Sequence, residues 1–399
     1  MRVGAHPGVL PATVSAGTDF EKIRWTPGIY DSVSLALSGS PVIENIQVAP
    51  KIADSSIVVL TALHNFGKDP VSFDLTQRVH PWKSDETSAV ARPEHVTLAA
   101  GETKVILGTL ALPGARLWTP ESPNLYVLET STGGDTATTR FGMREFRFDT
   151  ATKRAYLNGG VYFMRGSNIT LHRFFEDPLS GTLPWDEAWV RKLLVEIPHE
   201  MHWNSFRFCI GPVPDRWLDI ADEAGLLIQN EYFVWTGNAW HGPENQVHFD
   251  SDQMIREYTE WMRDNWNHPS VAIWDANNET WDSAFGEKII PAVRGLDLSN
   301  RPWENTRAAS LCNALCIPKR AAKKLHVLFP SCSTDQIFHL LDVLLEGATS
   351  SGRQPVFGTG DAPFEELVTS DVARFFQFAG VDAEIAVGGL EQPAEVVEA

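Results

Sequence analysis

Residues suited to acid–base chemistry follow an apolar stretch in the middle of the chain. The segment NHPSVAIWDANNETW runs from Asn267 to Trp281 and delivers Asn278 and Glu279 directly after a strand-like apolar run. A carboxyl group at the end of such a strand is desolvated, which raises its pKa toward the value that a general acid needs. We therefore predict that Glu279 protonates the oxygen of a leaving group. The structural alternative is that Glu279 only caps the helix after this strand.

Other strand ends carry side chains that suit a sugar ligand. Amides and carboxylates hydrogen-bond hydroxyl groups, and indole rings offer flat faces for pyranose rings. Each residue also has a structural alternative. Arg207 is then an ion-pair partner of Glu231, the tryptophan rings belong to the core, and the asparagines only close turns. The sequence nevertheless predicts a carbohydrate substrate, with the substrate-binding residues Asn168, Arg207, Glu231, Trp235 and Asn278.

The elements that must position these residues alternate between strand and helix from about residue 150. Apolar runs predict strands at 161–169, 204–211, 226–235 and 270–279. Between them, one helix begins after Asp186 as N-cap, and Gly225 closes the next. In the first helix we expect Trp189, Leu193, Ile197 and Met201 to form the buried face and Pro198 to kink or shorten it. A third helix carries Ile255, Tyr258 and Met262 at helical spacing. Near-continuous apolar strands that alternate with amphipathic helices predict a parallel sheet. Polar groups at the strand C-termini favour its barrel form.

Residues 41–148 have a different rhythm, with short β-rich runs separated by turn residues and no helical period. This spacing predicts an immunoglobulin-like β-sandwich of about 100 residues. The predicted fold class is therefore multidomain: a β-sandwich followed by an α/β TIM-type barrel. We place the first half of the barrel at 149–306, and we expect its second half to be irregular or incomplete.

Composition excludes several other classes of function. The net charge of −18 disfavours nucleic acid or an anionic membrane as a partner, and no apolar run reaches 18 residues. No glycine-rich phosphate loop, zinc spacing or Gly-x-Ser-x-Gly elbow is present, so we predict no cofactor and no metal. Cys312, Cys316 and His326 fit no standard metal-site spacing. We see no signal peptide at the N-terminus, and compartment and oligomeric state stay open.

The order and wording of these segments resemble glycoside hydrolase family 2, which includes β-galactosidases, β-glucuronidases and β-mannosidases. LWTPESPNLYVLET and FGMREFRFDTATKRAYLNGGVYFMRGSN are similar to the passage from the family's sandwich into its barrel, and NSFRFCIGPVPDRWLDIADEAGLLIQNEY to its second and third barrel strands. NHPSVAIWDANNE resembles the fourth strand, where the family carries its acid/base carboxylate. The resemblance implies retaining hydrolysis of terminal β-glycosidic bonds with Glu279 as general acid/base. It also implies that residues 1–40 are the last part of an N-terminal jelly-roll sugar-binding domain.

Two departures leave the identity of the sugar open. The family's second-strand motif usually has a histidine three residues after its arginine, and here that position is Ile210. Its first-strand motif usually has an Arg-His pair after the asparagine, and here Ile169 and Thr170 follow Asn168.

A third departure concerns residues 307–399. No Asp or Glu occurs between Asn305 and Thr334, although the chain has 51 acidic residues, and the family's nucleophile motif on strand seven is not found. Glu365 and Glu366 are weak candidates for that nucleophile. Our hypothesis is that this region is not the family's natural continuation. The alternative function is then a non-catalytic or degenerate glycan-binding relative.

Overall fold

The fold is described from a computed structural model. The described residues are 18–19, 29, 31–171, 174, 177, 179–235, 249–280 and 282–305. They belong to the first of two units of the chain, Met1–Ala308. The predictions for Cys312, Cys316, His326, Glu365 and Glu366, and for the segment 307–399 as a whole, lie outside the described residues.

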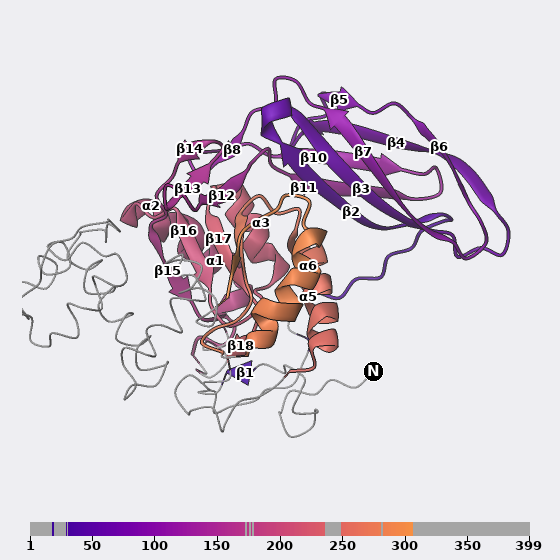
Figure 1. The fold of residues 1–399 in the computed structure, drawn as a ribbon. Helices are drawn as coiled ribbons and strands as arrows, with labels where there is room; N and C mark the ends of the chain where they lie inside the picture. Colours follow the sequence, from indigo (N-terminus) through magenta and orange to yellow (C-terminus); the bar gives the residue numbers. More distant parts are fainter. Residues whose placement is uncertain are drawn as a thin grey trace, which may run out of the picture. The chain divides into compact units, whose positions relative to one another are not determined.

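The sandwich predicted for the first part of the chain is present as two antiparallel sheets (Figure 1). One sheet has the order β2 (Val42–Lys51), β3 (Ser56–His64), β7 (Thr103–Ala111). The other has the order β11 (Thr136–Phe141), β10 (Tyr126–Ser131), β4 (Val71–Pro81), β5 (Ala89–Val90), and β6 (Glu94–Leu98) also pairs with β4. Alternating apolar residues of both sheets, such as Val48, Val59, Val79 and Leu128, form the core between them.

Short strands connect the sandwich to the barrel. A small hairpin joins β8 (Trp118–Thr119) and β9 (Ser122–Pro123), and a three-stranded antiparallel sheet contains β12 (Phe146–Asp149), β13 (Arg154–Leu157) and β14 (Gly160–Val161). The predicted strand 161–169 is therefore wrong in its extent, because the chain leaves the strand conformation at 162–165. Phe163 is exposed in that break, so no sheet face holds it.

The described residues of the barrel region form five parallel strands in sequence order: β15 (Gly166–Ile169), β16 (Ser205–Phe208), β17 (Leu227–Glu231), β19 (Val271–Asp275) and β20 (Trp303–Glu304). The first four match the predicted strands. The fifth was not predicted, because only two of its residues pair. Two further short strands, β1 (Thr18–Asp19) and β18 (Val234–Trp235), pair in parallel.

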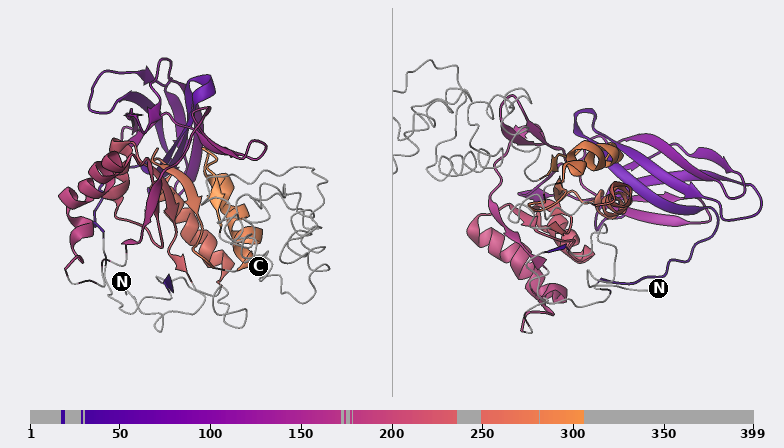
Figure 2. Two further views of the ribbon diagram at one scale, coloured as in Figure 1. Left: turned by 90° about the vertical axis from the view of Figure 1, so that its left-hand side faces the viewer. Right: turned by 60° about the horizontal axis from the view of Figure 1, so that its bottom comes forward.

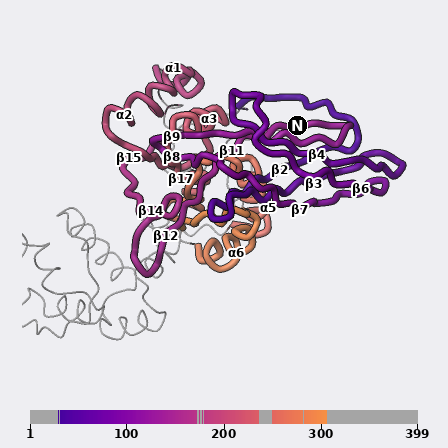
Figure 3. The backbone as a smooth tube through the Cα atoms, turned by 90° about the horizontal axis from the view of Figure 1, so that it is seen from above, coloured from indigo at the N-terminus to yellow at the C-terminus, as the bar shows by residue number. Residues whose placement is uncertain are grey.

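Helices flank these strands in two groups, one within residues 187–224 and one within residues 251–293 (Figures 2 and 3). The helix α3 (Asp215–Ala224) ends at Gly225 in the left-handed conformation, as predicted. The helix α5 (Ser251–Asn265) buries Tyr258 and Met262, and α6 (Ile290–Val293) follows the π-helical turn Phe285–Ile289. None of the described helices is long and apolar enough to cross a membrane.

The first helical segment departs from the prediction in its buried face. Asp186 caps α1 (Glu187–Arg191) by accepting from the backbone N–H groups of Ala188 and Trp189, as expected. The buried stripe, however, is Val190, Leu194 and Pro198, and Met201 is exposed. A π-helical turn (Lys192–Glu196) precedes Pro198, which begins α2 (Ile197–Met201). Proline cannot donate to the helix, and the wider turn accommodates it without a clash.

Sandwich residues contact the N-terminal ends of the barrel strands directly. Arg144 donates to the backbone oxygens of Pro269 and Val271, just where β19 begins. Asn267 accepts from Val48 N–H and donates to Ile46 C=O, both at 2.8 Å, so its amide pairs with the free edge of β2. These contacts fix the start of the strand that leads to Glu279.

Candidate active site

The C-terminal ends of β16 and β19 are joined by a side-chain hydrogen bond. Arg207 Nη2 donates to Asn278 Oδ1 at 3.0 Å. Asn278 also donates its backbone N–H to the carbonyl of Val234, at 2.8 Å. The amide predicted to bind substrate is thus held from two sides, and Glu279 follows it in the chain.

Arg207 also contacts two buried carboxyl groups. Its guanidinium pairs with Glu231 of β17, and its Nε donates to Asp275 Oδ2 of β19 at 3.1 Å. Asp275 accepts a second bond, at 2.7 Å, from Gln229 Nε2. Alternate residues of β17 and β19 therefore point into the barrel. The ion pair of Arg207 with Glu231, weighed above as a structural alternative, exists in this arrangement.

Sequence reasoning missed Asp275 and Glu304. Asp275 lies inside the segment that first drew attention, but only the residues after the strand were considered. Glu304 stands beside Asp275 in the register of β19 and β20, with the N–H of Ala276 bonded to the Glu304 carbonyl at 3.0 Å. Side chains in register on parallel strands share one face, so Glu304 joins the inward group. The signal available was the acidic residue at the last position of β17, β19 and β20. We call Arg207, Glu231, Asp275 and Glu304 the mouth cluster.

Burial and mutual repulsion shift the pKa values of the mouth cluster. Burial, then the Asp275 charge, raise the pKa of Glu231, and Arg207 only partly opposes them. Burial likewise raises the pKa of Asp275 against the opposing effect of Arg207. Burial and the neighbouring Asp275 raise the pKa of Glu304 to about 7. The mouth therefore favours protonated carboxyl groups.

Backbone conformation at the strand ends is unusual. Glu279 has a φ of +40° and Ile210 a φ of +56°. A β-branched residue is rarely found in the left-handed region, and such outliers concentrate at functional sites. The N–H of Ile210 donates to Glu231 Oε1 at 2.8 Å. The backbone at Ile210 therefore contacts the mouth cluster at the position where glycoside hydrolase family 2 usually has a histidine.

The other predicted residues lie around this centre. Asn168 of β15 is exposed and stands in register with Arg207. Trp235 is buried against Cys209 and Ile210, and Trp274 is a core residue whose Nε1 donates to Asp297. Glu279 is half-buried, and Asp282, not Glu279, accepts the N–H of Ala284 before the helix that follows. The structure thus joins Arg207, Glu231 and Asn278 by contacts, and leaves the roles of Asn168, Trp235 and Glu279 as predictions.

A second acidic group, at the opposite ends of the strands, is already paired. Asp219, Asp222 and His268 place ligand atoms within 4.8 Å of one another. The Arg140 guanidinium contacts both carboxylates, and His268 Nδ1 lies 2.7 Å from Asp222 Oδ2. An arginine and an imidazole therefore satisfy this group as an ion-pair network.

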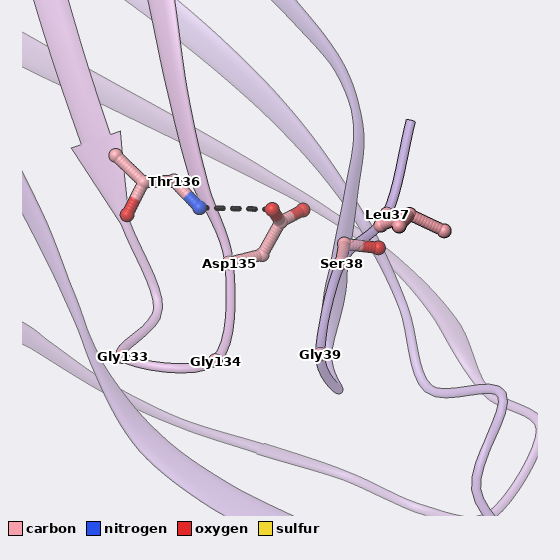
Figure 4. A pocket seen from close by; sticks show the side chains of 7 residues that line it. All are labelled: Leu37, Ser38, Gly39, Gly133, Gly134, Asp135 and Thr136. Atoms are coloured by element: carbon pink, nitrogen blue, oxygen red, sulfur yellow. Dashed lines mark hydrogen bonds between the residues drawn. The ribbon is translucent and has the colours of Figure 1, made fainter. Parts of the chain in front are cut away.

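A hollow of about 450 Å³ lies on the sandwich (Figure 4). It is lined by residues 37–39 and 133–136, where Gly39 N–H donates to Gly134 C=O at 3.0 Å. Its one charged side chain, Asp135, accepts from the backbone N–H groups of Ile43 and Thr136. The carboxylate is thus engaged in holding the loop, and the hollow offers no free reactive group.

Family comparisons agree with this architecture. The model "Glycosyl hydrolases family 2" matches residues 42–144, and the model "Glycosyl hydrolases family 2, TIM barrel domain" matches residues 185–327. The chain belongs to glycosyl hydrolase family 2. The barrel match continues beyond residue 306, where we expected the family pattern to end.

Individual relatives cover the same region. A protein of Formosa agariphila that is provisionally named a beta-glucuronidase is 31% identical over 193 residues, covering 44% of this chain and 17% of that protein. A beta-galactosidase of Photobacterium profundum is 25% identical over 276 residues, covering 64% of this chain and 25% of that protein. The chain thus spans a quarter or less of these two relatives.

Solved structures support the fold. A family 2 beta-galacturonidase from Eisenbergiella tayi has a TM-score of 0.53 and 24% identity, covering 67% of this chain and 46% of that one. A family 2 member from Bacteroides cellulosilyticus has a TM-score of 0.54 and 20% identity, covering 69% and 38%.

Proposed function

We propose that this chain hydrolyses terminal β-glycosidic bonds by a retaining, double-displacement mechanism, with Glu279 as general acid/base. The observation that carries the proposal is the hydrogen bond from Arg207 to Asn278. It fixes the Asn-Glu pair at the end of the fourth barrel strand, where a parallel barrel carries its chemistry.

Asn278 and Glu279 have distinct roles in this mechanism. Asn278 directs its amide at a sugar hydroxyl, because its carbonyl oxygen is occupied by Arg207. Glu279 gives its proton to the glycosidic oxygen while a second carboxylate attacks the anomeric carbon. In the second step Glu279 takes a proton from water, which releases the sugar with its configuration retained. Glu365 and Glu366, the sequence candidates for the second carboxylate, lie outside the described residues.

The experiment is a panel of aryl β-galactoside, β-glucoside, β-mannoside and β-glucuronide substrates, with the product anomer followed by proton NMR. The proposal expects turnover of at least one substrate and a β-anomer as first product. An α-anomer would contradict retention. Binding without turnover by the wild type would favour the glycan-binding alternative.

A further inference from the structure

The barrel mouth contains more acidic groups than its described basic group can neutralise. Within the mouth cluster, three carboxyl groups face the single guanidinium of Arg207, which already contacts Glu231 and Asp275. Carboxyl groups packed this closely cannot all ionise near neutral pH, since each negative charge raises the pKa of the others. The cluster therefore retains a proton.

Glu304 differs from the other two carboxyl groups in its partners. Glu231 pairs with Arg207, accepts the Ile210 N–H and, when protonated, donates to Asp275, which also accepts from Arg207 and Gln229. Among residues 31–171, 179–235, 249–280 and 282–305, no group donates a hydrogen bond to the Glu304 carboxyl. Glu231 and Asp275 are fully buried, whereas Glu304 is half-buried. Glu304 is thus the member of the cluster that is open to a ligand.

We propose that Glu304 is a substrate-binding residue that carries an exchangeable proton, separate from the one that Glu231 and Asp275 share, and donates a hydrogen bond to a hydroxyl group of the bound sugar. The proton stays on Glu304 through turnover, so no bond to it forms or breaks. This inference rests on the proposed glycosidase function. It adds a contact to the sugar from Glu304 on β20, the fifth strand.

The electrostatic surroundings of Glu304 agree with this role. The charged groups that act on it are Asp275 of β19 and Arg207 of β16, and burial with the Asp275 charge raises its pKa to about 7. Glu231 of β17, Cys209 after β16 and Tyr258 of α5 act on the same cluster one contact further away. A carboxyl group that keeps its proton near neutrality is a poor nucleophile and a good hydrogen-bond donor.

The first test compares the pH dependence of kcat/KM for wild type and Glu304→Gln on the best substrate of the panel. Glutamine keeps the size and always donates. We expect the alkaline fall of kcat/KM to begin near pH 7 in the wild type, as the donor ionises, and at a higher pH in the variant, which keeps only the dependence due to the general acid. Glu260→Gln, at an exposed carboxyl on α5 that pairs with Arg263, is the matched control and should follow the wild type.

The second test needs no turnover. Burying a carboxyl group whose pKa is raised in the folded state lowers the free energy of unfolding as the pH rises. The decrease begins at the unfolded pKa of about 4.3 and ends at the folded pKa of about 7. The melting temperature of Glu304→Gln relative to wild type should therefore rise between pH 4.5 and 7 and then level off. A pH-independent difference, or an alkaline limb of kcat/KM that the variant shares with wild type, overturns the inference. A wild type that hydrolyses no β-glycoside would count against the proposed function, while the melting profile still decides where the proton lies.

Discussion

The buried charged groups at the two ends of the barrel strands differ in how they are paired. At the N-terminal ends, against the sandwich, Arg301 pairs with Asp297, His268 pairs with Asp222, and Arg144 binds two backbone carbonyls. At the C-terminal ends, Arg207 pairs with Glu231 and Asp275 and also acts on the charge of Glu304. At the first end the carboxylates pair with cations, and the buried Arg144, whose pKa burial and the nearby Arg301 lower to about 9, donates to carbonyl oxygens. At the second end the described carboxyl groups outnumber the described cations.

This difference separates structural charge from functional charge. A network of ion pairs and carbonyl contacts between two domains orders the strands, whereas uncompensated acid lowers stability and persists where a site requires it. The junction also fixes the base of β19, because Arg144 and Arg301 both donate to the Val271 carbonyl. The strand β19 is thus anchored at its N-terminal end by two arginines and leads to the proposed site residues Asn278 and Glu279 at its C-terminal end.

The largest expected effect on stability comes from removing the only described cation of the mouth cluster. Arg207→Met leaves Glu231 and Asp275 without a counter-charge, which should lower the free energy of unfolding at pH 7 by about 3–5 kcal/mol. The loss should be smaller at pH 5 than at pH 7, since burial raises the pKa of both carboxyl groups and a lower pH favours their neutral forms. Urea unfolding at the two pH values measures this. Arg147→Met, at an exposed pair with Asp149, is the control and should cost little. An equal loss at both pH values would break the contrast with the junction.

The matching change at the junction is Arg144→Met. It removes donors to the Pro269 and Val271 carbonyls, and we expect a loss of about 2–3 kcal/mol, because at least one buried carbonyl is left unsatisfied. This loss should be the same at pH 5 and pH 7 in urea unfolding. A strong pH dependence would show that the junction, too, carries surplus charge.

A smaller effect is expected at the edge of β2. Asn267→Ala removes the two hydrogen bonds to Val48 N–H and Ile46 C=O, at a cost of about 2 kcal/mol for two neutral bonds. Asn267→Asp keeps the acceptor but turns a carboxylate oxygen toward the Ile46 carbonyl oxygen, so it should lose at least as much. If the alanine variant unfolds at the wild-type urea concentration, the amide does not hold this edge.

The smallest expected effect is the pH-dependent one at His268. Burial opposes both charges, but mutual attraction lowers the pKa of Asp222 and raises that of His268. The pair therefore stabilises fully between the unfolded pKa values of about 3.9 and 6.5. Its contribution is lost below that window as Asp222 gains a proton, and above it as the pH rises through the raised pKa of His268. His268→Gln should cost about 1.5 kcal/mol at pH 5 and less at pH 9, as measured by urea unfolding. A larger cost at pH 9 would reverse the assigned sign.

The sequence predicted correctly those features of the fold that depend on a few neighbouring residues. Asp186 as an N-cap, Gly225 as a C-cap and the apolar run before Asn278 all depend on a few adjacent residues, and the structure contains each of them. The buried face of the first helical segment, by contrast, differs from the predicted one. A π-helical turn changes which side chains face the core, and the spacing of apolar residues does not reveal such a turn.

The composition of the mouth depended on strand register, which is not local. Arg207, Glu231 and Asn278 were found because each stands at a visible strand end. Glu304 was missed because β20 pairs through only two residues, and its position beside Asp275 follows from hydrogen bonds between distant segments. Sequence alone therefore identified the ends of the strands but not the number of acids that meet there.

The most direct test of the central claim is the leaving-group dependence of Glu279→Gln, with and without azide. Glutamine keeps the shape of the side chain but cannot transfer the proton. We expect kcat/KM for β-glycosides with poor leaving groups to fall by about 10²–10⁴, and that for highly acidic aryl leaving groups to fall far less. Azide should then restore turnover of the activated substrates, because it attacks the glycosyl-enzyme without a general base. An equal loss for every leaving group, with no rescue by azide, would remove Glu279 from the acid/base role.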